Sequence, residues 1–159
     1  MEDARMERAE LALFFREGLF LPDMKARTKE EALEELVDLF VREHLVRNRG
    51  IVLEMLHKRE ALGSTGIGKG VAIPHGRTLA APDIVIAFGR SRQGIDYDAM
   101  DGKPVHLFFL VLAPPQDQSN KYLPVLGKLV EMLSEDENCQ KLMQVESFQE
   151  FIDVVVGEK

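Results

Sequence analysis

The chain has 159 residues, of which 45% are hydrophobic and 30% are charged, and its formal net charge is -7 at pH 7. A chain of this length fits one domain, because it can bury about two thirds of the surface that it exposes when unfolded. The acidic balance and the absence of clustered Lys and Arg exclude a general nucleic-acid binder, and no apolar run approaches the roughly 20 residues of a membrane span, so direct membrane insertion is not expected.

Cys139 is the only cysteine, which excludes an intrachain disulfide framework and favours a reducing compartment. The first eight residues alternate acidic and basic side chains and lack the apolar core of a secretory signal. We therefore expect a cytoplasmic protein.

Two helices are predicted in the first third of the chain. Thr28-Lys-Glu-Glu31 has the form of a capping box, and the apolar residues that follow it recur at helical spacing as far as about His44. Asn48-Arg-Gly50 interrupts the pattern, and a second, shorter helix then carries Arg59 near its C-terminal end.

Residues 63–70 hold four glycines, which would cost a helix about 4 kcal/mol relative to alanine, so this segment is predicted to be a loop. Short runs of β-branched and aromatic residues follow and predict strands, with a turn at Asp101–Gly102 before the last of them. The predicted strands are Val71–Ile73, Ile84–Phe88 and Val105–Leu112.

Beyond Pro114–Pro115 the helical pattern returns over Tyr122–Leu133, with a short helix around Gln140–Met143 and a last helix from the capping box at Ser147 to Gly157. Helices before and after a block of strands predict a mixed α/β fold, a three-layer α/β/α sandwich with a central mixed sheet. We expect a single domain over residues 18–157, preceded by an N-terminal extension at residues 1–17.

A glycine-rich segment invites comparison with nucleotide-binding loops. Gly63-Ser-Thr-Gly-Ile-Gly-Lys69 matches the first seven positions of the Walker A pattern, but Gly70 replaces the Ser or Thr that should bind magnesium, and a strand rather than a helix follows. The dinucleotide pattern G-x-G-x-x-G also fails, because Val71 stands where its third glycine should be. Nucleotide binding through Lys69 remains a minor alternative.

His75 differs from the other three histidines. His44 and His57 lie on predicted helices and His106 in a predicted strand, where structural or surface roles suffice. His75 follows a proline, precedes a glycine and ends the strand that leaves the glycine-rich loop, where a side chain is held rigidly and can still be reached.

The run from Arg59 through Gly63-Ser-Thr-Gly-Ile-Gly-Lys-Gly to Ile73-Pro-His75-Gly resembles the fructose/mannitol class of enzyme IIA domains of the bacterial phosphoenolpyruvate-dependent phosphotransferase system. The resemblance extends to Asp101-Gly-Lys-Pro-Val105 and to Asp117-Gln-Ser-Asn-Lys-Tyr-Leu123, and it covers most of residues 18–156. Within the class, the loop and the compact length are most similar to the nitrogen-regulatory enzyme IIA proteins.

The resemblance implies roles for individual residues. His75 matches the histidine that accepts phosphate on Nε2 from an HPr-type phosphocarrier protein, and Arg59 matches an arginine beside the phosphate. Thr65 and the neighbouring loop glycines, Gly66 among them, match the stretch packed beside the histidine. Because a glycine-rich loop with hydroxyls can present donors to an anion, Ser64 and Thr65 are candidates for helping to hold a phosphoryl group, although local turn roles suffice for either one alone. Many members carry a second active-site histidine where this chain has Tyr122, which can donate one hydrogen bond but is uncharged at neutral pH.

A neutral imidazole offers an unprotonated nitrogen to a phosphoryl group without a separate base, so neither a metal nor another cofactor is expected. A hydrogen bond from Nδ1 to a nearby backbone carbonyl would fix the tautomer that leaves Nε2 exposed. Two uses of the phosphoryl group stay open: a regulatory switch that changes which target proteins bind, or sugar transport by transfer to an enzyme IIB.

Overall fold

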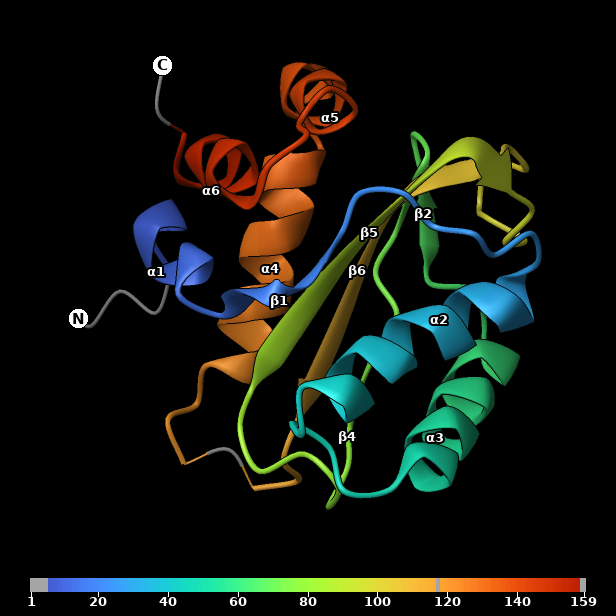
Figure 1. Ribbon diagram of the computed structural model, residues 1–159, viewed down its shortest axis with the longest axis vertical. Coiled ribbons are helices and arrows are strands. Elements are labelled where there is room, and N and C mark those ends of the chain that lie inside the picture. The colour runs from blue at the N-terminus through green and yellow to red at the C-terminus, as the bar shows by residue number, and fades with distance from the viewer. Residues whose placement is uncertain (1–5, 117, 158–159) are drawn as a thin grey trace.

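The protein is described by a computed structural model over residues 6–116 and 118–157, in which helices and strands build one layered domain (Figure 1). The helices are α1 (Arg8–Ala12), α2 (Lys29–Arg42), α3 (Arg49–Ala61), α4 (Tyr122–Leu133), α5 (Asp136–Leu142) and α6 (Phe148–Val156). The strands are β1 (Phe15–Leu21), β2 (Gly66–Gly68), β3 (Val71–Ala72), β4 (His75–Arg77), β5 (Val85–Ile95) and β6 (Val105–Ala113).

The six strands form one mixed sheet in the order β1-β5-β6-β3-β2, and β4 also pairs with β6. β5 and β6 are antiparallel and lie at the centre, β1 runs parallel to β5, and β3 and β4 run parallel to successive stretches of β6. The mixed sheet that the sequence predicted is confirmed.

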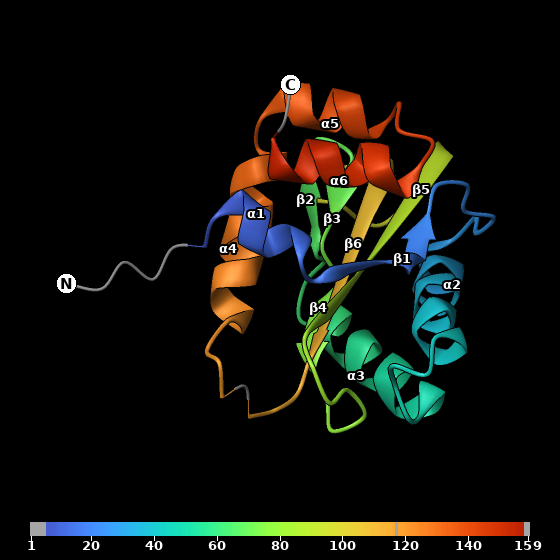
Figure 2. The same ribbon diagram turned by 60° about the vertical axis from the view of Figure 1, so that its left-hand side comes forward.

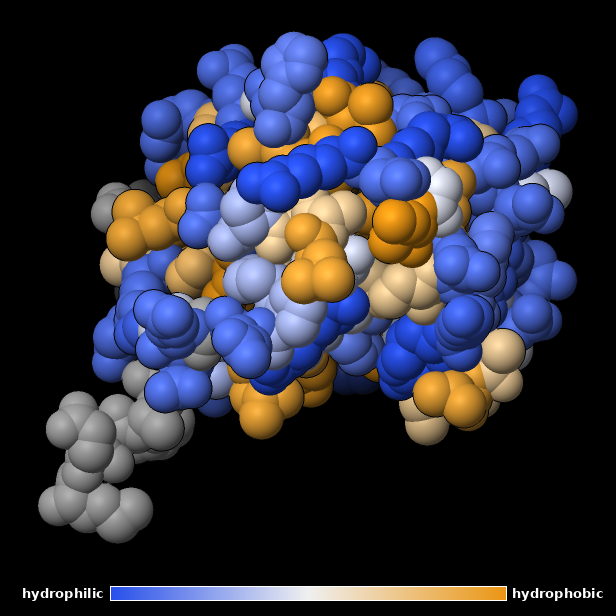
Figure 3. Space-filling view, turned by 90° about the horizontal axis from the view of Figure 1, so that it is seen from below, coloured by the Kyte–Doolittle hydropathy of each residue, from blue (hydrophilic) through white to orange (hydrophobic). Residues whose placement is uncertain are grey.

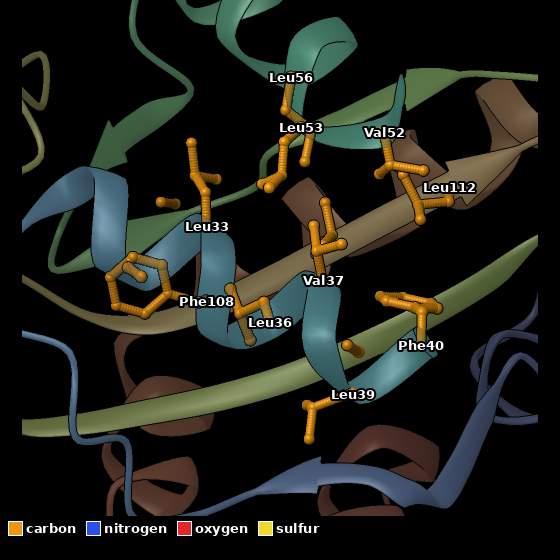
Figure 4. Close-up of a cluster of buried hydrophobic side chains, with 14 of the residues drawn as sticks. Leu33, Leu36, Val37, Leu39, Phe40, Val52, Leu53, Leu56, Phe108 and Leu112 are labelled. Carbon is orange, nitrogen blue, oxygen red and sulfur yellow. The ribbon is translucent and has the colours of Figure 1, made fainter. Parts of the chain in front are cut away.

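Helices cover both faces of the sheet, as the two views in Figures 1 and 2 show. α2 and α3 pack on one face, where their apolar side chains meet those of β6 in the cluster drawn in Figure 4. α1, α4 and α6 cover the other face around a second cluster that contains Phe88, Phe109 and Phe151. The three-layer α/β/α architecture is therefore confirmed, with one core on each side of the sheet.

The helix starts follow the capping chemistry of the sequence. The Thr28 hydroxyl accepts a hydrogen bond from the Glu31 amide at 3.1 Å, and Ser147 accepts from the Glu150 amide at the same distance. The Asn48 side chain caps α3 by accepting from the Ile51 amide at 3.1 Å. The second helix therefore begins directly after Asn48, earlier than the apolar pattern alone suggested.

The predicted loop over residues 63–70 was wrong in one part, because Gly66–Gly68 forms the short edge strand β2, antiparallel to β3. Sheet pairing here overrides the low strand propensity of glycine. A Cβ on Gly66 would lie 2.9 Å from the Cβ of Ala99, which belongs to the segment between β5 and β6. This close approach of the two segments needs a glycine at position 66.

Other element boundaries also differ. β5 runs to Ile95 rather than ending at Phe88, α2 ends at Arg42, and α5 begins at Asp136, earlier than the predicted short helix. Three elements, α1, β1 and β4, were not predicted from the sequence. The expected boundary between an extension and the domain, after residue 17, falls inside β1, and the side chain of Phe15 is buried in the core beside α6.

No helix in the described part of the chain combines the length and the apolar composition that crossing a membrane would require.

Candidate functional site

His75 is held by its own strand in a defined tautomer. Its ring is half-buried, and Nδ1 lies 2.7 Å from the carbonyl oxygen of Ile73. A carbonyl oxygen can only accept a hydrogen bond, so Nδ1 carries the proton and donates it. Nε2 is thereby left with its lone pair.

The alternation of the backbone between β3 and β4 explains why that carbonyl is available. β3 and β4 pair with the same strand, β6, but Ile73 and Pro74 between them belong to neither. A proline has no amide hydrogen to continue the ladder, although its carbonyl still accepts from the Val111 amide at 3.0 Å. The Ile73 amide donates to the Thr65 carbonyl at 3.0 Å, so the backbone groups of Ile73 face away from β6, and its carbonyl accepts from the imidazole two residues later.

Tyr122 opens α4 directly beside the histidine. The centroids of the Tyr122 and His75 rings are 6.4 Å apart, and the Arg77 guanidinium lies 4.7 Å from the centroid of the Tyr122 ring. Burial raises the pKa of Tyr122 to about 12, against the opposing influence of the Arg77 and Arg59 charges. The phenol therefore stays neutral at physiological pH, and both guanidinium groups lie close enough to act on it.

Arg59 approaches from the last turn of α3. Its Nη1 donates a hydrogen bond at 3.0 Å to the carbonyl of Gly63, which fastens the start of the glycine-rich segment to the helix end. A cation at a helix C-terminus also interacts favourably with the helix dipole. Arg59 thus combines an anchoring contact with a positive charge on the Tyr122 side of the site.

Glu60, next to Arg59, organises the same segment through a buried hydrogen-bond network. Its carboxylate accepts from the Thr65 amide at 3.1 Å, from the Thr65 hydroxyl and from the Tyr97 hydroxyl at 3.2 Å. Lys29 neutralises it from 3.0 Å and lies 4.5 Å from the centroid of the Tyr97 ring. Only 6% of the Glu60 side chain is exposed, so the loop before β2 is fixed to α3 from inside the protein.

The polar groups of Ser64, Thr65 and Gly66 are already bonded within the protein. The Ser64 hydroxyl donates to the Tyr97 carbonyl at 2.8 Å and accepts from the Gly66 amide at 3.0 Å. The Thr65 hydroxyl is buried and bonded to Glu60. The structure thus gives these three residues a part in shaping the loop, and direct support of a phosphoryl group by them stays a prediction.

Lys69 lies away from this cluster. Its Nζ donates to the carbonyl of Ser134 at 3.0 Å and pairs with Asp136 at 3.2 Å, at the far end of α4 from Tyr122. The twelve residues of α4 span about 18 Å, so Lys69 and His75 belong to different parts of the surface. Within residues 6–116 and 118–157, no group of three His, Cys, Asp or Glu side chains is arranged to hold a metal ion.

The family model for the phosphoenolpyruvate-dependent sugar phosphotransferase system, EIIA 2, matches residues 13–156. The chain belongs to this family.

Relatives of this EIIA domain include both sugar-specific and regulatory proteins. The fructose-specific EIIA component of Haloferax volcanii is 41% identical over 128 residues, which cover 80% of this chain and 82% of the relative. The fructose-specific EIIABC component of Bacillus subtilis is 35% identical over 84% of this chain, but the match spans only 21% of that longer protein.

Solved structures agree with the assignment. The nitrogen regulatory protein IIA-Ntr of Neisseria meningitidis superimposes with a TM-score of 0.84 at 36% identity, covering 91% of this chain and 98% of that one. A complex of the mannitol enzyme IIA of Escherichia coli with phosphorylated enzyme IIB shares the fold, with a TM-score of 0.74 at 21% identity over 91% of this chain and 99% of the other.

At this site, Tyr122 and Arg77 lie beside His75, whose Nδ1 bonds to the Ile73 carbonyl, and the Arg59 charge acts on the Tyr122 phenol. The expected roles of these residues toward a phosphoryl group stay predictions. Arg77 was missed because residues 75–77 were not predicted to be a strand. The signal was present, since two residues apart in a strand point to the same face.

Exposed leucines lie next to the polar residues of the EIIA site along the chain. Leu62 ends α3 after Arg59, Leu79 follows β4, and Leu123 is the second residue of α4, with exposed fractions of 85%, 85% and 69%. On the face shown in Figure 3, apolar side chains gather in small groups among hydrophilic ones.

Proposed function

We propose that this EIIA domain carries a phosphoryl group on Nε2 of His75, accepted from an HPr-type phosphocarrier protein. The observation that supports the proposal most directly is the 2.7 Å contact between Nδ1 and the Ile73 carbonyl, because it leaves Nε2 as the unprotonated nitrogen. The family assignment makes the chain a phosphotransferase component, and the tautomer supports Nε2 as the acceptor atom.

The transfer step needs no proton to leave the histidine. The Nε2 lone pair forms the new N–P bond as the N–P bond to the donor histidine breaks, and the electron pair of that bond returns to the donor nitrogen. The Nδ1 proton stays in place, and the Ile73 carbonyl stabilises the positive charge that the phosphorylated ring gains. Arg59 is the expected donor to the phosphoryl oxygens.

The test is incubation with phosphoenolpyruvate, enzyme I and HPr, followed by mapping of the acid-labile phosphate. We expect one phosphate per chain on His75 and none in His75→Ala. His106→Ala is a matched control, because His106 also directs Nδ1 to a backbone carbonyl, that of Ser91 at 2.8 Å, but lies beside Gly70 and Gly94. Full labelling of His75→Ala would refute the proposal.

For the use of the phosphoryl group, the leading reading is a regulatory switch of the nitrogen-regulatory type. It is supported by the similarity to the Neisseria meningitidis protein over nearly the whole chain. Phosphorylation adds roughly two negative charges at the site, enough to repel an acidic or apolar partner without any large conformational change. Pull-downs with phosphorylated wild-type protein and with His75→Ala should recover different target proteins, and identical sets would contradict a switch.

The second candidate is a sugar-transport component that donates phosphate to an enzyme IIB. The Haloferax volcanii relative, which is named a fructose-specific component, favours this reading. Rapid transfer from the phosphorylated protein to an enzyme IIB of the same cell would establish transport. Either use places the protein in the cytoplasm, where the phosphocarrier would deliver the group.

A further inference from the structure

We propose that Arg77 is a second phosphoryl-binding cation, held beside His75 by the aromatic ring of Tyr122. The proposal rests on the proposed function, because it concerns the group that His75 would carry. In this proposal, the Tyr122 ring is an apolar platform that holds Arg77 in place, and Arg77 provides the positive charge and the hydrogen-bond donors.

The register of β4 places His75 and Arg77 on one face of the sheet. His75 is paired with Val111 and Arg77 with Ala113, and both partners belong to the core under α4. Gly76 between them faces the other way, since a Cβ there would collide with Met55 of α3. Two residues of a strand span about 6.6 Å, so both side chains leave the strand close together on the α4 side.

Tyr122 fixes the guanidinium in this position. It is only 7% exposed, and its ring contacts both neighbours, with 6.4 Å between its centroid and that of His75 and 4.7 Å to the Arg77 guanidinium. A guanidinium at this distance from an aromatic ring is held by a cation–π interaction. A second contact, from Arg77 Nη1 to the Pro115 carbonyl at 3.1 Å, restricts its rotation.

This arrangement leaves the charge of Arg77 available for an anion. Among residues 6–116 and 118–157, no carboxylate forms a salt bridge with Arg77. Five N–H groups in a planar fork suit bidentate bonding to phosphoryl oxygens, and the contact with Pro115 uses only one nitrogen. The Arg59 charge also lowers the pKa of the same phenol, so a second positive charge acts on Tyr122.

A purely structural role for Arg77 is the competing explanation, in which it only fastens the segment after β6 through Pro115. The two roles differ in what a substitution changes. A structural fastener affects the unfolding midpoint, whereas a phosphoryl ligand affects the rate of transfer and the ionisation of the bound group.

The experiment compares single-turnover phosphorylation by phospho-HPr in wild-type protein and in Arg77→Gln. Loss of a charged hydrogen-bond donor should slow transfer by about 10- to 100-fold. Arg92→Gln is the matched control, because Arg92 is also exposed but pairs with Asp23 near the C-terminal end of β5, away from β4. This variant should be phosphorylated at the wild-type rate. A rate in Arg77→Gln within about twofold of wild type would overturn the proposal.

The platform role is tested at Tyr122. Tyr122→Phe keeps the ring and should transfer at nearly the wild-type rate, whereas Tyr122→Leu removes the ring and should slow transfer about as much as Arg77→Gln. If Tyr122→Phe is as slow as Tyr122→Leu, the hydroxyl rather than the ring is responsible, and the platform is refuted.

A second measurement does not depend on rates or on small changes in stability. Phosphorus NMR of the phosphorylated protein gives the pKa at which the phosphoryl group loses its last proton, and this pKa should rise in Arg77→Gln because a nearby positive charge is gone. An unchanged value would overturn the proposal. A wild-type transfer rate in Arg77→Gln, with no labelling of His75→Ala, would defeat only this inference, whereas labelling of His75→Ala would defeat the proposed function.

Discussion

Replacing Glu60 by alanine tests whether a buried network holds the loop beside the site. Glu60 is 6% exposed and receives the Thr65 amide and hydroxyl, the Tyr97 hydroxyl and the Lys29 ammonium. Its removal leaves those donors facing a space that no carboxylate fills. Each buried donor left without a partner costs about 1–3 kcal/mol.

The size of the effect follows from these contacts. Removing one member of a buried ion pair destabilises proteins by about 3–5 kcal/mol. The lower end applies here, because the Thr65 and Tyr97 hydroxyls lie 3.3 Å apart and can bond to each other, and Lys29 is 23% exposed and can be hydrated. For a chain of this length, a loss of about 3 kcal/mol lowers the Tm by about 6–12 °C.

Urea unfolding and calorimetry would measure this loss directly. Glu54→Ala is the matched control on the same helix, since Glu54 is 69% exposed and its pairing with Lys58 spans 4.0 Å, so it should change the free energy of unfolding by less than about 0.5 kcal/mol. If Glu60→Ala costs less than about 1 kcal/mol, the network does not stabilise the loop and the reasoning fails.

Three further predictions concern other parts of the fold. Burial raises the pKa of both tyrosines, Tyr97 and Tyr122, above their ordinary value of 10.0, so the free energy of unfolding should fall as the pH rises above about 10. If absorbance shows that both tyrosines of the folded protein are fully ionised near pH 10, this prediction is wrong. Gly66→Ala should lower the free energy of unfolding in urea by about 1–3 kcal/mol, because the added methyl group meets Ala99 close to its backbone and not a flexible side chain. An unchanged free energy would show that β2 can move away from Ala99 at no cost. Arg90 is 1% exposed and donates hydrogen bonds to the carbonyls of Pro22, Leu142 and Val145. Arg90→Ala should therefore lower the free energy of unfolding by at least about 3 kcal/mol in urea unfolding. A loss as small as that of a surface arginine would contradict its role in joining these segments.

Local chemistry in the sequence determined much of the helical framework. Thr28 and Ser147 start helices because their hydroxyls accept backbone amides three residues ahead, a contact that needs no other part of the chain. The apolar runs within β5 and β6 likewise predicted two strands, whose central place in the sheet only the structure shows. At the site, Pro74 and Gly76 around the histidine already indicated a rigid, accessible position.

Tertiary structure decided what depends on pairing between distant segments. β1 and β4 are edge strands whose short sequences carry no clear alternation, and they become strands because β5 and β6 offer unpaired backbone groups. The same pairing turns Arg77 toward Tyr122 and directs the Ile73 carbonyl away from β6, where it accepts from His75. Residue type along the chain could identify the histidine, but only the register of β4 against β6 could determine which groups surround it, because side-chain direction in a strand is set by its partner.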